Sequence, residues 1–347
     1  MNSFERYQNA LAGLPVDKIP NFDIIMGFGA QFIGQKLRAY YLDHRVLVES
    51  NLAMVDHFGL DILQAISDSY REAHDFGLEV DFPEDGMPVV KRPLLVDEMR
   101  IRQLKPLDPG TGKRMSDRLE AVWMFAQQAK GSLPIMGWVE GALAELADIR
   151  GVSQTLLDLV DRPGWLEEAL DVITQTEIAF GIAQVRAGAD IIGMGDSLAS
   201  QISPRMYREF ALPYEKRIIE AIHQAGAKVR LHICGNTTRI FPDMTTSGAD
   251  ILDVDHMVDL AGARQVAQER AGLLGIQEPA LTGNFDPVSV MLQGSEEQVA
   301  SSVEACILQG GPRYMSAAGC EIPPGTPPGN LLAQDQVLWD TAKRLLR

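Results

Sequence analysis

The sequence of 347 residues predicts one closed parallel (β/α)8 barrel, a TIM barrel, that spans residues 1–347 as a single domain. Three observations predict it. Helix-like segments that end near Gly are followed by short apolar strands, and this unit recurs along the chain. The strands are continuous runs of Ile, Val and Leu, which suit burial on both faces. The chain has no GxGxxG after its first strand and no GxxxxGK[ST] loop, so an open doubly wound sheet is the second choice.

About eight strand candidates follow this plan in chain order. The first is “NFDIIMG” near the start, and the others lie in segments 57–66, 133–138, 185–196, 223–235, 245–256, 270–278 and 310–320. In the segment 270–278 the apolar letters “LLGI” read as the strand. The helix candidates carry start signals, such as Ser203 before Pro204 and Ser295 before an acidic turn. Residues 81–118 are irregular and read as loops and short strands.

Composition and charge narrow the class of function. The chain is 46% hydrophobic and 22% charged, as in an ordinary soluble globular protein, and its formal net charge is −16. That charge argues against nucleic acid or an anionic membrane as a partner. No apolar run reaches the length of a membrane span, and the N-terminus lacks the apolar block of a secretory signal. We therefore expect a cytoplasmic protein; its oligomeric state is open, with a homodimer as one alternative.

Polar residues cluster where the predicted strands end, which is where barrel enzymes place their chemistry. They are Glu140, Asp196, His232, Cys234, Asp255, His256, Gln277, Glu278, Asn284, Asp286 and Cys320. Several also have structural interpretations. Glu140 would suit the start of a helix, where its charge meets the dipole, and Asp196 would suit a cap. Cys306 lies on the apolar face of a helix and reads as a small core residue.

The pair His232 and Cys234 predicts a metal site. The two side chains lie two positions apart at a strand end and leave the same face of the strand. Together with Cys320 they could bind Zn²⁺ through two sulfurs and one nitrogen, which leaves a fourth position for substrate, as in catalytic zinc sites. The structural alternative is a buried histidine with two inert cysteines.

Four stretches of the chain resemble the uroporphyrinogen decarboxylase superfamily, and within it the corrinoid-dependent methyltransferases that act on methylcobamide. They are “ERYQNALAGLPVDKIP”, “GADIIGMGDSLASQISPRMYREFALPYEKRI”, “LTGNFDPVSVMLQGSEEQV” and “GCEIPPGTPPGNLLA”, and the resemblance covers nearly the whole chain. True decarboxylases carry an early Arg-Gln-Ala-Gly-Arg-Tyr motif, whose arginines bind substrate carboxylates. Here that region reads “FDIIMGFGAQFIGQKLRAYY” and lacks the motif. Uroporphyrinogen decarboxylase is therefore the alternative function, and a non-enzymatic zinc-dependent scaffold is a third.

The resemblance implies that His232, Cys234 and Cys320 are zinc ligands, and that a methyl group moves between methylcobalamin on a separate corrinoid protein and a small acceptor. In some relatives a Glu after the next strand is a fourth, displaceable ligand. Asp255 occupies that place here, and its shorter side chain would act through a bridging water. The acceptor is a zinc-activated thiol such as coenzyme M, or else tetrahydrofolate. For tetrahydrofolate, Glu140 and Asp196 would hold the pterin and manage a proton, with Gln277 as a further candidate.

Overall fold

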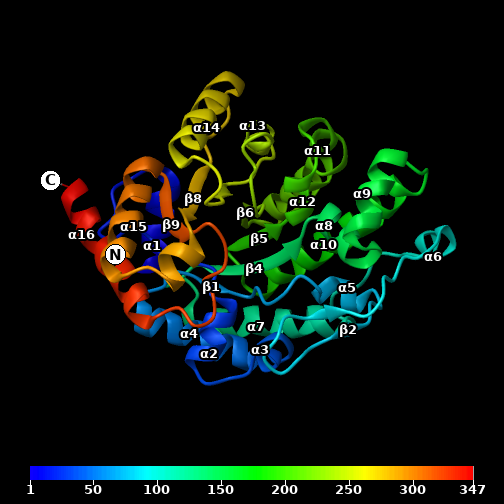
Figure 1. Cartoon of the computed structure of the whole chain (residues 1–347), viewed down its shortest axis with the longest axis horizontal. Coiled ribbons are helices and arrows are strands. Elements are labelled where there is room, and N and C mark those ends of the chain that lie inside the picture. The colour runs from blue at the N-terminus through cyan, green and yellow to red at the C-terminus, as the bar shows by residue number, and fades with distance from the viewer. Residues whose placement is uncertain (347) are drawn as a thin grey trace.

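The centre of the computed structural model, which describes residues 1–346, is a curled parallel sheet of seven strands in the order β1-β4-β5-β6-β7-β8-β9 (Figure 1). The strands are β1 (Leu63–Gln64), β4 (Ile135–Glu140), β5 (Ile191–Gly195), β6 (Lys228–His232), β7 (Ile251–Val254), β8 (Ala280–Phe285) and β9 (Tyr314–Ala318). Neighbours in the sheet are consecutive along the chain, without the reversal of order that defines a doubly wound sheet. The predicted barrel topology is therefore confirmed, and the second choice is wrong.

The first strand candidate, “NFDIIMG”, closes the ring although it forms a single bridge pair. Asn21 pairs in parallel with Ser316 of β9, and Phe22 N donates to Ser316 O at 2.7 Å. On its other side, Asp61 N, just before β1, donates to Asn21 O at 2.9 Å. The segment stays short because Pro20 has no N–H before it and helix α2 (Met26–Phe32) begins directly after it.

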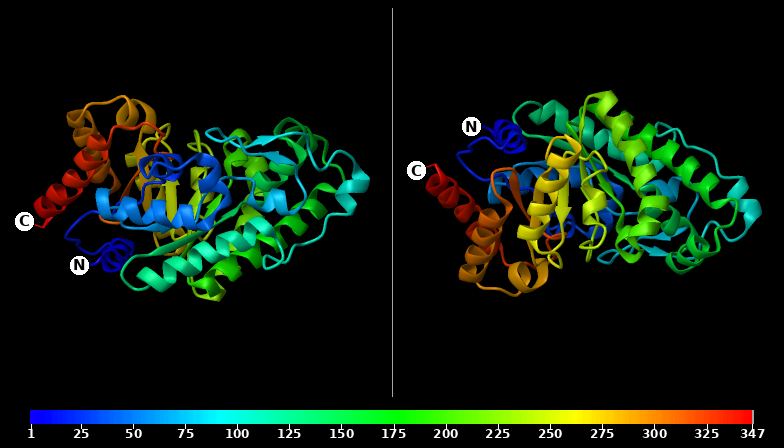
Figure 2. Two further views of the ribbon diagram at one scale, coloured as in Figure 1. Left: turned by 90° about the horizontal axis from the view of Figure 1, so that it is seen from below. Right: turned by 90° about the horizontal axis from the view of Figure 1, so that it is seen from above.

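Helices cover the outside of the curled sheet (Figures 1 and 2). The longer ones are α1 (Ser3–Ala12), α4 (His44–Phe58), α7 (Lys113–Ala129), α8 (Ala142–Arg150), α9 (Val152–Asp161), α10 (Leu166–Ala187), α12 (Leu212–Ala225), α14 (Leu260–Leu274), α15 (Glu296–Gly310) and α16 (Pro328–Leu345). The shorter ones are α3 (Leu37–Leu42), α5 (Arg71–Asp75), α6 (Glu98–Arg102), α11 (Pro204–Phe210), α13 (Phe241–Met244), the 3-10 helix η1 (Ser197–Gln201) and the π-helix η2 (Pro287–Leu292). Among residues 1–346, no helix combines the length and apolar character needed to cross a membrane.

The predicted sequence signals act where expected. Gly59 and Gly226 end α4 and α12 in the left-handed conformation, with φ of +63° and +97°. Ser203 caps α11, and Ser295 forms a capping box at the start of α15. The irregular residues after β1 contain β2 (Val80–Asp81) and β3 (Val89–Val90), which pair antiparallel as a separate two-stranded sheet.

Three predicted boundaries are wrong. The letters “LLGI” belong to the end of α14, which runs to Leu274 and stops at Gly275, so the strand that follows is β8 from Ala280. Strand β4 begins two residues later than expected, directly after Pro134, which has no N–H to donate to a sheet. The long predicted helix from Pro204 divides at Ala211 into α11 and α12, where Pro213 occupies the first turn of α12.

Candidate functional site

Three side chains that could bind a metal ion meet at the carboxyl end of the sheet. His232 is the last residue of β6, Cys234 follows two residues later, and Cys320 follows the end of β9. Their donor atoms all lie within 4.8 Å of one another. The two sulfurs are 3.7 Å apart, and His232 Nε2 lies 2.9 Å from Cys234 Sγ and 4.0 Å from Cys320 Sγ. The structure therefore assembles the predicted set from segments 86 residues apart.

Gly319 lets the segment that carries Cys320 approach the loop after β7 closely. Gly319 passes so close to the loop after β7 that a Cβ on it would lie 2.4 Å from the backbone nitrogen of His256. Its N–H donates to Phe285 O at 2.9 Å, which fixes the turn that presents Cys320. A side chain at position 319 would push Cys320 away from His232 and Cys234.

Two of the three donor spacings are close to those of tetrahedral zinc. With Zn–S of about 2.3 Å and Zn–N of about 2.0–2.1 Å, tetrahedral angles place two sulfurs about 3.8 Å apart and a sulfur and a nitrogen about 3.6 Å apart. The observed sulfur–sulfur distance is 3.7 Å, and the Cys320–His232 distance is 4.0 Å. The Cys234–His232 distance of 2.9 Å would have to open by about 0.7 Å. A hydrogen bond from Cys234 is the main cause that lowers the pKa of the Cys320 thiol, which favours its thiolate form, the form that binds a metal.

A buried carboxylate orients the histidine. Asp253 Oδ2 accepts from His232 Nδ1 at 2.6 Å, so that Nε2 faces the two cysteines. Arg230 Nε contacts both oxygens of Asp253 at 2.8 and 3.1 Å. Burial alone would raise the pKa of Asp253, but the Arg230 guanidinium lowers it, so the group is ionised. Neither residue was among the predicted site residues, although Arg230 lies on the same face of β6 as His232 and Asp253 interrupts an apolar strand.

Asp255 holds a loop instead of joining the three donors. Its Oδ2 accepts from Gly235 N at 2.9 Å, and its Oδ1 accepts from Met257 N at 3.0 Å. His256 Nδ1 also lies 3.1 Å from Oδ1. The carboxylate is not part of the group whose donor atoms converge within 4.8 Å. Asp255, the expected fourth ligand, therefore stabilises in this structure the turn that follows Cys234.

Glu140 ends β4 and faces the same space as the three donors. Its Oε1 accepts from Arg71 Nη2 at 2.8 Å and from Trp138 Nε1 at 3.1 Å. Burial is the main cause that raises the pKa of Glu140 to about 8; Glu72 raises it further and Arg71 opposes the shift. The interpretation as a simple partner of a helix start does not describe these contacts. Glu140 is a carboxyl group able to exchange a proton near neutral pH.

A buried acidic cluster lies behind Glu140, and the sequence analysis did not anticipate it. Burial is the main cause that raises the pKa of Glu72, Glu145 and Glu177, and neighbouring carboxylates add to it in Glu145 and Glu177. Within residues 1–346, neither carboxylate oxygen of Glu145 or Glu177 has a hydrogen-bond partner. These side chains come from three different helices, so no local pattern in the sequence would reveal their meeting.

Asp196 ends β5 as predicted, but its side chain turns away from the three donors. It is fully buried, and its Oδ1 accepts from Ala144 N in the first turn of α8 at 3.0 Å. Burial is the main cause that raises its pKa well above the usual value, and the nearby Glu215 adds to the shift. The capping interpretation is therefore the one that the structure supports, across strands rather than within its own turn.

Gln277 lies at the opposite end of the sheet. Because helix α14 ends at Leu274 within “LLGI” and no strand forms there, Gln277 and Glu278 fall in the connection that enters β8, and Gln277 is exposed. The expectation that it contacts a substrate at the rim is wrong for this reason. Cys306 is buried on α15, in agreement with its interpretation as a core residue.

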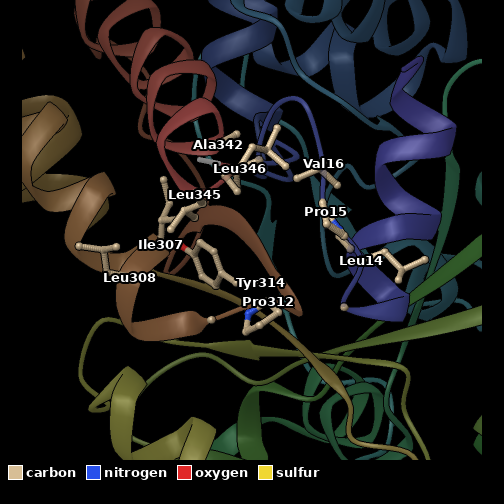
Figure 3. Close-up of a pocket in the computed structure, with 14 residues that line it drawn as sticks. Leu14, Pro15, Val16, Ile307, Leu308, Pro312, Tyr314, Ala342, Leu345 and Leu346 are labelled. Carbon is tan, nitrogen blue, oxygen red and sulfur yellow. The ribbon is translucent and has the colours of Figure 1, made fainter.

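A cavity of about 220 Å³ joins Glu140 to the three donors. Its lining residues are Ile24, Met26, Tyr41, Ile66, Ser67, Asp68, Ser69, Tyr70, Met87, Pro88, Trp138, Glu140, Gly195, Ser197, His232, Cys234, Cys320 and Glu321. A second, apolar pocket of about 380 Å³ lies at the other end of β9, between the loop after α1 and helices α15 and α16 (Figure 3). Tyr314 is its single titratable lining residue within the described chain, so the first cavity is the candidate active site.

Comparison with known proteins places the fold and site in a family. The family model described as “Uroporphyrinogen decarboxylase (URO-D)” matches residues 2–343, so the chain belongs to the uroporphyrinogen decarboxylase family. It is similar to the methylcobamide:CoM methyltransferase MtbA of Methanosarcina acetivorans, with 28% identity over 94% of each chain. It is also similar to the uroporphyrinogen decarboxylase of Xanthomonas axonopodis, with 30% identity over 74% of this chain and 72% of the relative. A solved “methyltransferase from Methanosarcina mazei” shares the fold, with a TM-score of 0.87, 23% identity and full coverage of both chains.

Proposed function

We propose that this protein transfers a methyl group from a methylated corrinoid, held by a separate protein, to a small thiol. The single observation that supports this most strongly is the convergence of His232, Cys234 and Cys320 on one cavity, with their donor atoms within 4.8 Å of one another. Relatives named methylcobamide:CoM methyltransferases, similar over 94% of the chain, point to the same chemistry.

The three donors would hold one Zn²⁺, and Asp253 would keep the imidazole of His232 in the tautomer that presents Nε2. A zinc ion in such a site supplies Lewis acidity that favours the thiolate form of a bound thiol. Two thiolates and a neutral imidazole give the loaded site no net charge, so the incoming thiolate meets no repulsion from an excess of sulfur ligands.

Glu140 is the chain's own candidate for the proton of the acceptor thiol. Its carboxyl group lines the cavity, and its pKa of about 8 lets it take up that proton near neutral pH. The thiolate sulfur then forms a bond to the methyl carbon while the cobalt–carbon bond breaks. The electron pair of that bond stays on cobalt, so the products are the methyl thioether and the Co(I) corrinoid.

The corrinoid must dock at the rim of the barrel. A cavity of about 220 Å³ holds a small thiol but not a corrin macrocycle. The macrocycle therefore has to lie across the mouth, presented by a corrinoid protein, with its methyl group directed at the thiolate.

The two alternatives receive less support. Tetrahydrofolate binding was expected to use Glu140, Asp196 and Gln277, and of these Glu140 alone lines the cavity within the described chain. Uroporphyrinogen decarboxylase must hold a substrate rich in carboxylates, yet no Arg or Lys among residues 1–346 lines the cavity.

The test combines purified protein with methylcobalamin and a series of acceptors, coenzyme M, homocysteine and tetrahydrofolate, under anaerobic conditions. Formation of the Co(I) spectrum is recorded beside the zinc content. We expect thiol-dependent demethylation that is lost together with zinc in Cys234→Ala. The matched control is Cys306→Ala, the buried cysteine outside the site, which should keep both. Demethylation with tetrahydrofolate alone, unchanged in Cys234→Ala, would refute the proposal.

A further inference from the structure

The wall of the cavity carries carboxylates and no basic side chain. Asp68, Glu140 and Glu321 line it, whereas no Lys or Arg in the described part of the chain does so. An acceptor with an anionic tail would therefore find no basic side chain on this wall to balance its charge.

The nearest guanidinium groups are buried behind these carboxylates. Arg71 is fully buried and donates to Glu140 at 2.8 Å. Arg114 is also buried and donates to Asp68 at 2.5 Å. Each guanidinium group is thus paired with a carboxylate and buried behind it, so neither can bind a ligand in the cavity.

Glu321 has no such partner. Its Oε1 accepts from Gly27 N at 2.7 Å, and it forms no ion pair with any residue among 1–346. The side chain is partly exposed, directly after Cys320, so it faces the space next to the three donors. A ligand cation could therefore reach this carboxylate.

Aromatic rings supply a second, independent feature. Tyr41, Tyr70 and Trp138 all line the cavity. The faces of such rings attract ammonium groups, most strongly where water is excluded. The indole of Trp138 fits because its neighbour on β5 is Gly193, where a Cβ would lie 2.2 Å from the ring. One carboxyl group without an ion partner, that of Glu321, beside aromatic faces in a small cavity is the combination that recognises a cation.

We propose that the methyl acceptor is a small thiol whose tail carries a positively charged ammonium group, in contrast to the anionic sulfonate of coenzyme M. This inference rests on the proposed function, because it names the class of acceptor for the same site. Glu321 receives the ammonium group, and the aromatic wall shields it from water while the sulfur lies at the three donors.

The test uses three thiols with the same two-carbon chain and different charge: 2-aminoethanethiol, 2-mercaptoethanol and 2-mercaptoethanesulfonate. Each is titrated into protein loaded with Co²⁺ in place of zinc, and the thiolate-to-cobalt absorption band gives Kd without any methyl transfer. We expect the aminothiol to bind at least about tenfold more tightly than the sulfonate, with the alcohol between them.

Glu321→Gln should reduce that preference several-fold, because the amide keeps the hydrogen bond from Gly27 N but loses the charge. Comparing the ratio of the two Kd values between variants cancels the different intrinsic acidities of the thiols. The control Glu49→Gln removes an exposed carboxylate on α4 and should leave the ratio unchanged.

Two failures are distinguishable. If the sulfonate binds most tightly to the wild-type protein, or if Glu321→Gln leaves the ratio unchanged with normal cobalt content, the inference about the acceptor is wrong while thiol methylation stands. If no thiol perturbs the cobalt spectrum and none demethylates methylcobalamin, the proposed function itself fails, and the inference with it.

Discussion

The substitution Asp253→Asn tests whether the buried carboxylate of Asp253, which lies between Arg230 and His232, controls the affinity of the candidate metal site. The asparagine oxygen can still accept from His232 Nδ1, now 2.6 Å from Asp253 Oδ2, but it no longer adds negative charge to the imidazole. Loss of such an outer partner typically weakens metal binding 10–100-fold, which is about 1.4–2.8 kcal/mol. The buried guanidinium of Arg230 also loses its ion partner, which costs about 3–5 kcal/mol of folding free energy.

Competition with a chromophoric chelator measures the zinc affinity, and near-UV circular dichroism shows that the variant is folded at the assay temperature. Asp250→Asn is the matched control, because Asp250 precedes the same strand and pairs with Lys228 and His223 at the far end of β7. It should change zinc affinity less than about twofold. A folded Asp253→Asn protein with the zinc affinity of the wild type would refute the reasoning.

Four further predictions follow from the structure. Cys320→Ser should abolish stoichiometric zinc binding, measured by metal analysis, because a serine hydroxyl is a poor substitute for a thiolate; full retention of zinc would exclude Cys320 as a ligand. Wild-type kcat/KM should rise as pH increases through about 8, where Glu140 loses its proton, and Glu140→Gln should flatten this profile. The raised pKa of Glu140 also means that its contribution to folding is present at low pH and is lost as pH rises toward about 8, so the same variant should reduce that slope in denaturant titrations. Gly193→Ala should destabilise the protein by about 1–3 kcal/mol, since its Cβ would meet Trp138 at 2.2 Å; Gly272→Ala, with open space on α14, should not destabilise it.

Local chemistry explains which parts of the fold could be predicted. Glycines that end helices mark most helix boundaries, and continuous apolar runs mark most strands. Both signals can be read from the sequence because each acts within a few residues. The segment at Gln277 was misread because an amphipathic helix end and a short buried strand look alike until Gly275 is recognised as the stop. The first strand was overestimated because Pro20 and the early start of α2 limit its pairing.

The site was predictable where its chemistry is rare and less so where it depends on packing. His232, Cys234 and Cys320 stand out because soft ligands are few in this chain. The direction of a carboxylate is not encoded locally: Asp196 and Glu140 both end strands, yet one turns toward α8 and the other toward the cavity. A buried Arg or Asp in the middle of an apolar strand was a usable signal, because such charges are tolerated when paired.

The candidate metal site and the closure of the barrel depend on the same short segment. In the sheet β6 and β9 are separated by β7 and β8, so the positions of His232 and Cys320 are set by the whole ring. Residues 20–24 make hydrogen bonds to both β6 and β9. Phe22 O accepts from Arg230 Nη1 of β6 at 3.0 Å, and Asp23 Oδ1 accepts from Ala318 N of β9 at 2.8 Å. Zinc bound at 1,000 times its Kd would stabilise this closed form by about 4.1 kcal/mol. A fall in thermal stability on chelation is therefore expected of a catalytic zinc here. It cannot by itself distinguish an enzyme from a zinc-dependent scaffold, and binding of a thiol at the fourth position is the measurement that does.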